Sequence, residues 1–529
     1  MPYGPAAAKV FCSICTDPPR GGALIKYRDT RSYLREALPY TEVILQGIAP
    51  GGGLFVPERL PQMTLAEIED LGTVPYWQRA AEIYWRFELD LSATRVAAIS
   101  RQAYSENFDH HQIAPVRAVG ANRFVLELWH GPTLAFKDMA LQCMPLFFST
   151  ALEYSRARGR AGGDFLVLVA TSGDTGVAAL SGFADRPHTK IAVCYPSGGV
   201  SPIQQRQMVT QPGDNLTVFE LEGDFDACQS AVKAVFADET FAAELKTHHD
   251  LQLSSANSIN WGRLMPQIVY YISAYADLVA RGHCTLGDPI DVCVPSGNFG
   301  NILAAHYAKR MGAPIDRLLC ASNANNVLAD FLATGRYEIA DRSLVKTASP
   351  SMDILISSNL ERLLYETAGD GARVRGWMDD LKNSRRFELD DDTFSRLRAD
   401  LVGDWVDNQT CIEAIGRAYR EQQYLIDPHT AVAWEVADRH AGDLPMLVVS
   451  PAHWSKFPAD VMRGLKGLPE AHELAQNEFE LLDEIQRLAP GNAVPAGMRD
   501  VLSRPVRFSN RIEGDQESLE QGLRGWLSR

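Results

Sequence analysis

Five apolar runs in the central part of the chain share one pattern: a run of Val, Leu and Ile leads into a turn and then a helical segment. Because the apolar residues do not alternate with polar ones, each run predicts a strand buried on both faces, as in a parallel sheet. Five such units favour a doubly wound α/β architecture, whose ligands bind beyond the carboxyl ends of the strands. The runs begin RFVLELWHGPTLAFKDMALQCM, DFLVLVATSGDTGVAALSGFA, KIAVCYPSGGVSPIQQRQM, IDVCVPSGNFGNILAAHYAKRMG and LPMLVVSPAHWSKFPADVMRGLKG.

The residues around this pattern predict further modules. Residues 1–110 are helix-like around a Gly-rich turn and predict an N-terminal module. We expect a small α/β domain over residues 111–220 and a large α/β domain over residues 221–529, the latter with a helical insertion at about 320–440. The final residues, RPVRFSNRIEGDQESLEQGLRGWLSR, predict a short strand or turn and a closing helix.

Composition narrows the classes of function. The 529 residues are 46% hydrophobic and 22% charged, which is typical of a soluble globular protein. The net charge of -15 argues against a nucleic-acid binder, although a pocket for a small anion can still be locally basic. No stretch approaches the about 18 apolar residues of a membrane helix, and the N-terminus lacks a signal-peptide pattern. We therefore expect a cytoplasmic protein with no membrane partner.

The nine cysteines are dispersed, which predicts reduced thiols. Cys12 and Cys15 form one CxxC pair, but no second pair follows nearby to complete a zinc site. We interpret the pair as part of an N-terminal tail and expect no metal.

The motif SGNFGN follows one apolar run and opens a predicted helix. Backbone N–H groups and polar side chains at a helix start can hold an anion, so the motif predicts a phosphate cradle. It matches neither of the common nucleotide-binding glycine motifs, and an ordinary tight turn is the alternative. Its residues are Ser296, Gly297, Asn298, Phe299, Gly300 and Asn301.

The motif TSGDTG has the same placement after another apolar run. Its hydroxyls and helix-start N–H groups suit a carboxylate, and the alternative is that Asp174 only caps the helix. The candidate carboxylate ligands are Thr171, Ser172, Gly173 and Thr175.

A third polar group, NSINWGR, contains Asn257, Ser258 and Arg263. The guanidinium of an arginine forms a natural fork for phosphate or carboxylate. A surface cap with a solvated arginine is the alternative interpretation.

Lys137 lies in HGPTLAFKDMALQ, at the start of a predicted helix, where the helix dipole disfavours a cation. The dipole and neighbouring cations would lower the pKa of its amine, and a neutral amine is what a Schiff base requires. Together with a phosphate loop, a carboxylate loop and an arginine, this lysine fits pyridoxal phosphate. A lysine that extends to solvent from a partly buried helix is the alternative.

From about residue 25 to the C-terminus the chain resembles threonine synthase, in its longer enterobacterial and fungal form. GIAPGGGLFVPE, HGPTLAFKDMALQ, ATSGDTG, VPSGNFGN, NSINWGRLMPQIVYY and SPSMDILISSNLERLL carry the resemblance, in the right order. It implies a fold-type II pyridoxal-phosphate enzyme of two α/β lobes, similar to tryptophan synthase β. It also implies that Lys137 forms the Schiff base and that Asp174 and Ser450 contact the cofactor.

The resemblance further implies a reaction, in which O-phospho-L-homoserine and water give L-threonine and phosphate. Lys137 would act as general base and acid. Asn257, Ser258 and Arg263 would bind the substrate phosphate, and the TSGDTG loop its carboxylate. A monomer or a homodimer is expected.

Four positions depart from the family pattern. Gly199 replaces a usual Lys or Arg, Pro451 replaces a threonine near the pyridine nitrogen, and Asn301 replaces Asp. YRDTRS stands in place of Y-x-S-T-R. These departures are either tolerated drift or the mark of a paralogue that acts on a different γ-substituted amino acid. A non-catalytic protein that binds amino acids or pyridoxal phosphate is a further alternative.

Overall fold

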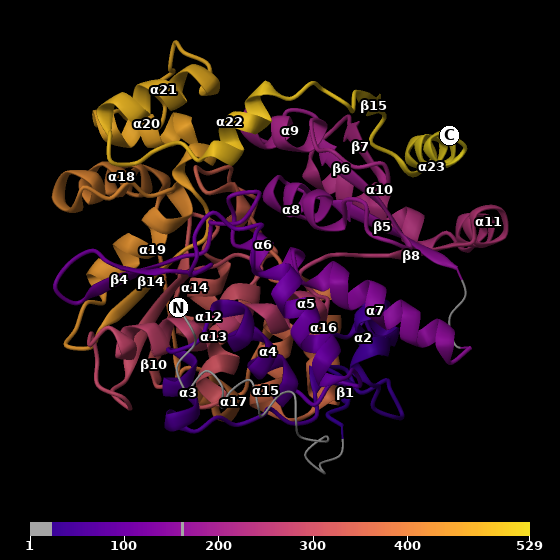
Figure 1. The fold of residues 1–529 in the computed structure, drawn as a ribbon, viewed down its shortest axis with the longest axis horizontal. Coiled ribbons are helices and arrows are strands. Elements are labelled where there is room, and N and C mark those ends of the chain that lie inside the picture. The colour runs from indigo at the N-terminus through magenta and orange to yellow at the C-terminus, as the bar shows by residue number, and fades with distance from the viewer. Residues whose placement is uncertain (1–23, 160–162) are drawn as a thin grey trace.

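The computed structural model describes residues 24–159 and 163–529, which form two large sheets covered by helices and two small two-stranded sheets (Figure 1). Cys12 and Cys15 lie outside the described residues, so their interpretation stays a prediction. Within the described ranges, no helix combines the length and the apolar character that a membrane crossing requires.

The larger sheet has six strands in the order β13-β10-β9-β14-β4-β3. All neighbours are parallel except β3 and β4, which pair antiparallel. Every residue of β9 and of β14 is buried, as expected for strands covered on both faces. The strands are β3 (Val116–Ala118), β4 (Arg123–Glu127), β9 (Ile290–Pro295), β10 (Ile315–Ser322), β13 (Leu401–Trp405) and β14 (Met446–Ser450).

The smaller sheet has five strands in the order β15-β7-β6-β5-β8, and all of them are parallel. Two of its strands, β8 and β15, come from the range expected for the large domain. The smaller sheet is therefore built from segments on both sides of the predicted boundary at residue 220. The strands are β5 (Asp164–Ala170), β6 (Thr189–Pro196), β7 (Leu216–Leu221), β8 (Leu251–Ser254) and β15 (Asn510–Ile512).

Each of the five predicted strand-turn-helix units is present. The strands β4, β5, β6, β9 and β14 lead into the helices α6 (Lys137–Leu141), α8 (Asp174–Phe183), α9 (Pro202–Val209), α13 (Gly300–Arg310) and α20 (Pro458–Lys466), the last after the short helix η3 (Trp454–Lys456). The ends of these strands bring the helix starts of both lobes toward one another, and α6 lies between the two lobes in Figure 1.

The N-terminal module is mainly helical, as predicted. It contains β1 (Tyr27–Asp29), α2 (Tyr40–Gln46), η1 (Pro50–Gly52), β2 (Phe55–Pro57), α3 (Leu65–Leu71), α4 (Tyr76–Arg86) and α5 (Ala93–Ala103). The helices that flank the two sheets are α7 (Met144–Ala157), α10 (Phe225–Ala237), α11 (Glu239–His249), α12 (Trp261–Ala280), α18 (Asn408–Gln422) and α19 (Pro428–Arg439).

The insertion after β10 is helical with one small two-stranded antiparallel sheet. It contains α14 (Val327–Thr334), β11 (Arg336–Glu338), η2 (Pro350–Met352), α15 (Leu360–Ala368), α16 (Gly371–Ser384), β12 (Arg386–Glu388) and α17 (Asp391–Leu397). The chain ends with α21 (Glu478–Leu488), α22 (Ala496–Ser503), the edge strand β15 and α23 (Gln516–Leu527), so the predicted short strand and closing helix are confirmed.

Candidate active site

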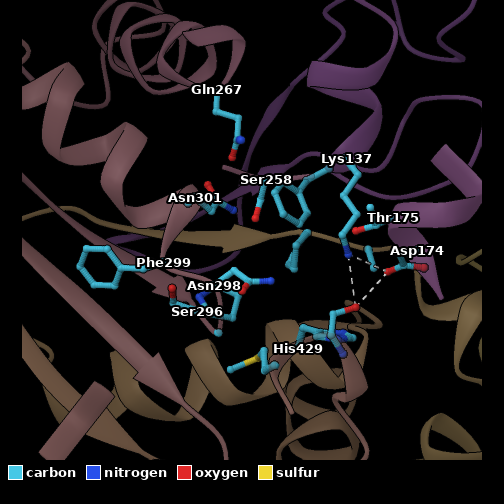
Figure 2. Close-up of a pocket in the computed structure, with 18 of the residues that line it drawn as sticks. Lys137, Asp174, Thr175, Ser258, Gln267, Ser296, Asn298, Phe299, Asn301 and His429 are labelled. Atoms are coloured by element: carbon cyan, nitrogen blue, oxygen red, sulfur yellow. Dashed lines mark hydrogen bonds and ion pairs between the residues drawn. The ribbon is translucent and has the colours of Figure 1, made fainter. Parts of the chain in front are cut away.

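A pocket lies where the helix starts of the two lobes face each other. Figure 2 shows Lys137, Asp174 and Thr175 on one side of it and the loop of Ser296 and Asn298 on the other. The sequence therefore brings the candidate lysine and the candidate phosphate cradle to one place, as the convergence of strand ends predicts.

Lys137 is the first residue of α6, as predicted, and its side chain is almost fully buried. Its Nζ lies 3.6 Å from Oδ2 of Asp174 and donates a hydrogen bond of 3.4 Å to Oγ of Ser351. Burial lowers the pKa of the Lys137 amine; the Asp174 carboxylate opposes that shift, and the cation of Arg263 adds to it. The neutral amine that nucleophilic attack requires is thus favoured relative to a lysine in water.

Asp174 is the first residue of α8, and its carboxylate does not cap that helix. Oδ1 forms an ion pair with Nζ of Lys456 at 2.9 Å and accepts a hydrogen bond from Nε2 of Gln204 at 2.9 Å. Burial alone would raise the pKa of Asp174, but the ammonium groups of Lys456 and Lys137 outweigh burial and hold that pKa well below its usual range. The pocket therefore contains one permanently ionised carboxylate.

The loop of residues 296–299 is held from behind by the helical insertion. Oγ of Ser357 donates to the carbonyl of Gly297 at 2.5 Å, and the backbone N–H of Asn359 donates to the carbonyl of Asn298 at 3.1 Å. Phe299 is left-handed, with a φ of 63°, a conformation that bulky residues adopt mainly at functional turns. The carbonyls of the loop thus face protein partners.

The backbone N–H of Ser296 donates to the carbonyl of Ala321 at 2.9 Å, but the other donor groups of the same loop have no partner among the described residues. Within the described ranges, no acceptor is found for the backbone N–H of Gly297, Asn298 or Phe299. The hydroxyl of Ser296 and Nδ2 of Asn301 are buried and also lack a hydrogen bond. Unpaired buried donors at the start of a helix fit an anion such as the phosphate of pyridoxal phosphate.

Asn301 is oriented by two tyrosines. The hydroxyls of Tyr270 and Tyr271 each donate to its Oδ1 at 2.6 Å, so Nδ2 is the atom left without a partner. An amide donor suits a phosphate better than the family's aspartate would, because a carboxylate would repel the anion.

The TSGDTG motif divides into a structural part and a pocket part. The hydroxyl of Thr171 accepts hydrogen bonds from the backbone N–H groups of Gly173 and Gly176, at 3.0 and 2.9 Å, and so shapes the turn itself. Thr175 and Asp174 line the pocket, whereas Thr171, Ser172 and Gly173 do not. Their role toward a substrate carboxylate stays a prediction.

The NSINWGR motif also divides. Ser258 and Arg263 line the pocket, and Asn257 lies exposed on the surface. Arg263 is buried: its Nη1 donates to the carbonyl of Ala256 at 2.8 Å, and its Nε has no partner. Among the described residues it forms no ion pair, and burial lowers its pKa to about 10. A buried cation of this kind calls for an anion from outside the chain.

Of the departing positions, Gly199 lies apart from the chemistry predicted for it, whereas Pro451 lies at the pocket. Gly199 is exposed in the turn after β6 and is not among the residues that line the pocket. The hydroxyl of Ser450 is 2.9 Å from that of Thr430 and accepts from Nε1 of Trp129 at 3.1 Å, while Pro451 lines the pocket. A contact between Ser450 and the cofactor stays a prediction.

Three residues of this region were not singled out from the sequence. Ser351 donates to Asp174 at 3.3 Å, and its backbone N–H donates to Nε2 of His429 at 3.2 Å. His429 in turn lies 2.7 Å from Asp427 through Nδ1. Lys456 is fully buried behind Asp174.

Replacing Gly297 by alanine is expected to weaken cofactor binding about tenfold or more and to destabilise the fold by about 1–3 kcal/mol. A Cβ atom there would lie 2.9 Å from the Cα of Met352, so the cradle could not keep its position against the insertion. Cofactor titration and thermal unfolding would measure both effects. Gly376→Ala is the matched control, because nothing lies within 4 Å of a Cβ there; an equal loss of affinity in both variants would contradict the prediction.

Two sequence families match the chain. The family described as "Pyridoxal-phosphate dependent enzyme" matches residues 111–450, and "Threonine synthase N terminus" matches residues 26–104. Among curated proteins, Threonine synthase-like 1 of Homo sapiens is 42% identical over 461 residues, which are 85% of this chain and 61% of that protein. The chain thus spans about 61% of the length of these relatives. Threonine synthase of Pseudomonas aeruginosa is 37% identical, over 88% of this chain and 95% of that protein.

Solved structures give the same comparison. The pyridoxal-phosphate-bound threonine synthase from Brucella melitensis is 35% identical, with a TM-score of 0.82 over 96% of this chain and 100% of that one. Yeast threonine synthase is 32% identical, with a TM-score of 0.83 over 96% of this chain and 99% of that one. Both structures share the fold-type II architecture that the sequence predicts.

Proposed function

The chain belongs to the threonine synthase family of pyridoxal-phosphate-dependent enzymes, and we propose that it converts O-phospho-L-homoserine and water to L-threonine and phosphate. Its cofactor is pyridoxal 5'-phosphate. When bound, that group supplies an electron sink for negative charge at the substrate carbon next to the amino group. Lys137 would hold the cofactor covalently, and the loop of residues 296–301 would hold its phosphate.

The observation that carries the proposal is the unpaired cation of Arg263. The cradle accounts for one anion, the cofactor phosphate, with its own set of donors. Arg263 is a separate donor that lines the same pocket beside Ser258 and has no carboxylate partner among the described residues. A substrate with a second phosphate, at its γ-carbon, would satisfy this guanidinium.

Lys137 would move the protons of the reaction. Its Nζ is a basic atom that lines the pocket 3.6 Å from the ionised Asp174, and it donates to the hydroxyl of Ser351 at 3.4 Å. Once the substrate amine replaces it at the cofactor, the freed amine would take and return protons at the substrate's Cα, Cβ and Cγ. Water would then add at Cβ after phosphate leaves from Cγ.

A paralogue that removes or replaces a different γ-substituent is the second candidate. The 42% identity to Threonine synthase-like 1 exceeds the 37% identity to the Pseudomonas threonine synthase. Gly199 also lacks the cation that the family pattern places in that turn, but the turn does not line the pocket. The higher identity is therefore the observation that favours this candidate.

An assay of the cofactor-loaded protein with O-phospho-L-homoserine separates the candidates. Phosphate, threonine and 2-oxobutyrate would be measured in one reaction, with the visible absorbance of the cofactor recorded alongside. We expect phosphate and threonine in equal amounts. Phosphate with 2-oxobutyrate would mean elimination without the addition of water. If the protein is yellow but forms none of the three products, O-phospho-L-homoserine is not its substrate, and the result supports the paralogue.

A further inference from the structure

Lys456 is a second lysine beside the site, and its side chain has no exposed surface. Its ammonium donates hydrogen bonds to the carbonyl of Thr133 at 2.8 Å and to Oε1 of Gln207 at 2.8 Å, and it forms an ion pair with Oδ1 of Asp174 at 2.9 Å. Three oxygens of the protein thus surround this ammonium. Lys456 itself does not line the pocket.

The two lysines contact different carboxylate oxygens of Asp174. Oδ1 faces Lys456 at 2.9 Å, and Oδ2 faces Lys137 at 3.6 Å. The contact with Lys456 is shorter and fully buried, whereas Lys137 reaches into the pocket, where Figure 2 shows its amine turned toward Asp174. One carboxylate thus has a permanent partner on the protein side and a variable partner on the pocket side.

The acceptors of Lys456 come from the segments that build the site. Thr133 precedes Lys137 by four residues and donates to the buried carboxyl of Asp138. Gln207 lies on α9, and Asp174 begins α8. Lys456 follows β14 of the other sheet, so one ammonium joins the two lobes at the back of the pocket.

We propose that Lys456 is a positioning residue for Lys137: its ammonium is the standing counter-ion of Asp174, which keeps that carboxylate ionised and fixed while the Lys137 amine stays free to react with the cofactor. The proposal rests on the assignment of Lys137 as the cofactor lysine and is independent of the substrate.

The sign of the effect follows from the charges near Lys137. Asp174 stabilises the protonated amine, while Arg263 and Lys456 destabilise it. The other titratable groups nearby are His429, His453 and Asp138. Burial lowers the pKa of His453 to about 3 and raises that of Asp138 to about 6, so both pKa values lie below the range from pH 7 to 10. Without Lys456, the pKa of Lys137 must rise, because Asp174 then has Lys137 as its nearest ammonium.

The test measures how fast the cofactor-stripped full chain takes up pyridoxal phosphate between pH 7 and 10, followed by visible absorbance. The uptake rate depends on the fraction of neutral Lys137 amine. In Lys456→Met, which keeps the length of the side chain, we expect the midpoint of the pH profile to rise by about one unit and uptake at pH 7 to slow about tenfold. Lys466→Met removes an exposed lysine that pairs with Glu484, and its midpoint is expected to match the unmodified protein. A folded Lys456→Met protein with an unchanged midpoint would overturn the proposal.

A second variant covers the case in which Lys456→Met does not fold. Removing one partner of a buried pair leaves an uncompensated charge, whereas neutral replacement of both partners is far better tolerated. We therefore expect Asp174→Asn together with Lys456→Met to fold, as circular dichroism and thermal unfolding would report. If the double variant also fails to fold, Lys456 is a structural tie between the lobes and the proposal is wrong. If Lys137→Ala still takes up the cofactor covalently, the lysine assignment fails instead.

Discussion

Replacing Lys137 by alanine is expected to abolish covalent attachment of the cofactor and to lower turnover by at least about 10⁴-fold. The pocket offers no other amine: among the described residues that line it, Lys137 is the sole lysine, and the buried ammonium of Lys456 contacts oxygens of Thr133, Gln207 and Asp174. Visible absorbance of the purified variant and phosphate release from O-phospho-L-homoserine would measure the two losses.

Lys466→Ala is the control for this change, because that lysine lies on the exposed side of α20 and pairs with Glu484 at 2.7 Å. It should keep the colour and the rate of the unmodified protein. The phosphate cradle does not involve Lys137, so Lys137→Ala should still bind pyridoxal phosphate weakly and reversibly. A Lys137→Ala protein that keeps both the covalent cofactor and its turnover would show that the chemistry lies elsewhere.

The strands that carry the site could be predicted because they are buried on both faces. Such strands have no polar side to interrupt the apolar run, and β9 and β14 are buried at every residue. The short strands β8 and β15 gave no comparable signal. Asn510 of β15 pairs with Phe219 of β7 although more than half of the chain separates them, and no local sequence pattern encodes such a contact. Because of this pairing, the smaller sheet includes a strand from the range predicted for the large domain.

The pocket residues that could be read from the sequence are those at helix starts directly after predicted strands. Lys137, Asp174 and the 296–301 loop all have that position. Ser351 was missed because it comes from the short helix η2 of the insertion, which does not directly follow a long apolar run. Lys456 could have been found by the reasoning that found Lys137, since SPAHWSKF places a lysine in an apolar context just after a strand. Its tie to Asp174, however, spans 282 positions of sequence that only the fold brings together.

Arg263 and Arg362 form a natural pair for separating function from stability. Both guanidinium groups are buried, and burial lowers both pKa values to about 10. Arg362 donates to the carbonyl of Phe55, to Oδ1 of Asn359 and to the carbonyl of Ile259, at 2.9, 2.6 and 2.5 Å. Arg263 has one such bond and an unpaired Nε. The hydrogen-bond donors of Arg362 thus have partners within the fold, whereas Nε of Arg263 has none.

Arg263→Met is therefore expected to lower kcat/KM for O-phospho-L-homoserine by about 100-fold or more, without lowering the melting temperature of the unliganded protein. The charge of Arg263 has no counter-ion until an anion binds. Its removal therefore weakens the complex with the substrate and does not destabilise the unliganded protein. Arg362→Met is expected to lower the free energy of unfolding by about 3 kcal/mol or more, because it removes the donor of three hydrogen bonds, two of them buried.

Thermal unfolding and steady-state kinetics on both variants would decide the matter, with inorganic phosphate as a probe of the anion site. Phosphate should raise the melting temperature of the unmodified protein more than that of Arg263→Met, because a ligand stabilises only the state that binds it. If Arg263→Met melts as early as Arg362→Met and keeps its kcat/KM, then Arg263 serves the fold. The pocket would then have no second anion site, and the preference for a γ-phosphate would lose its physical basis.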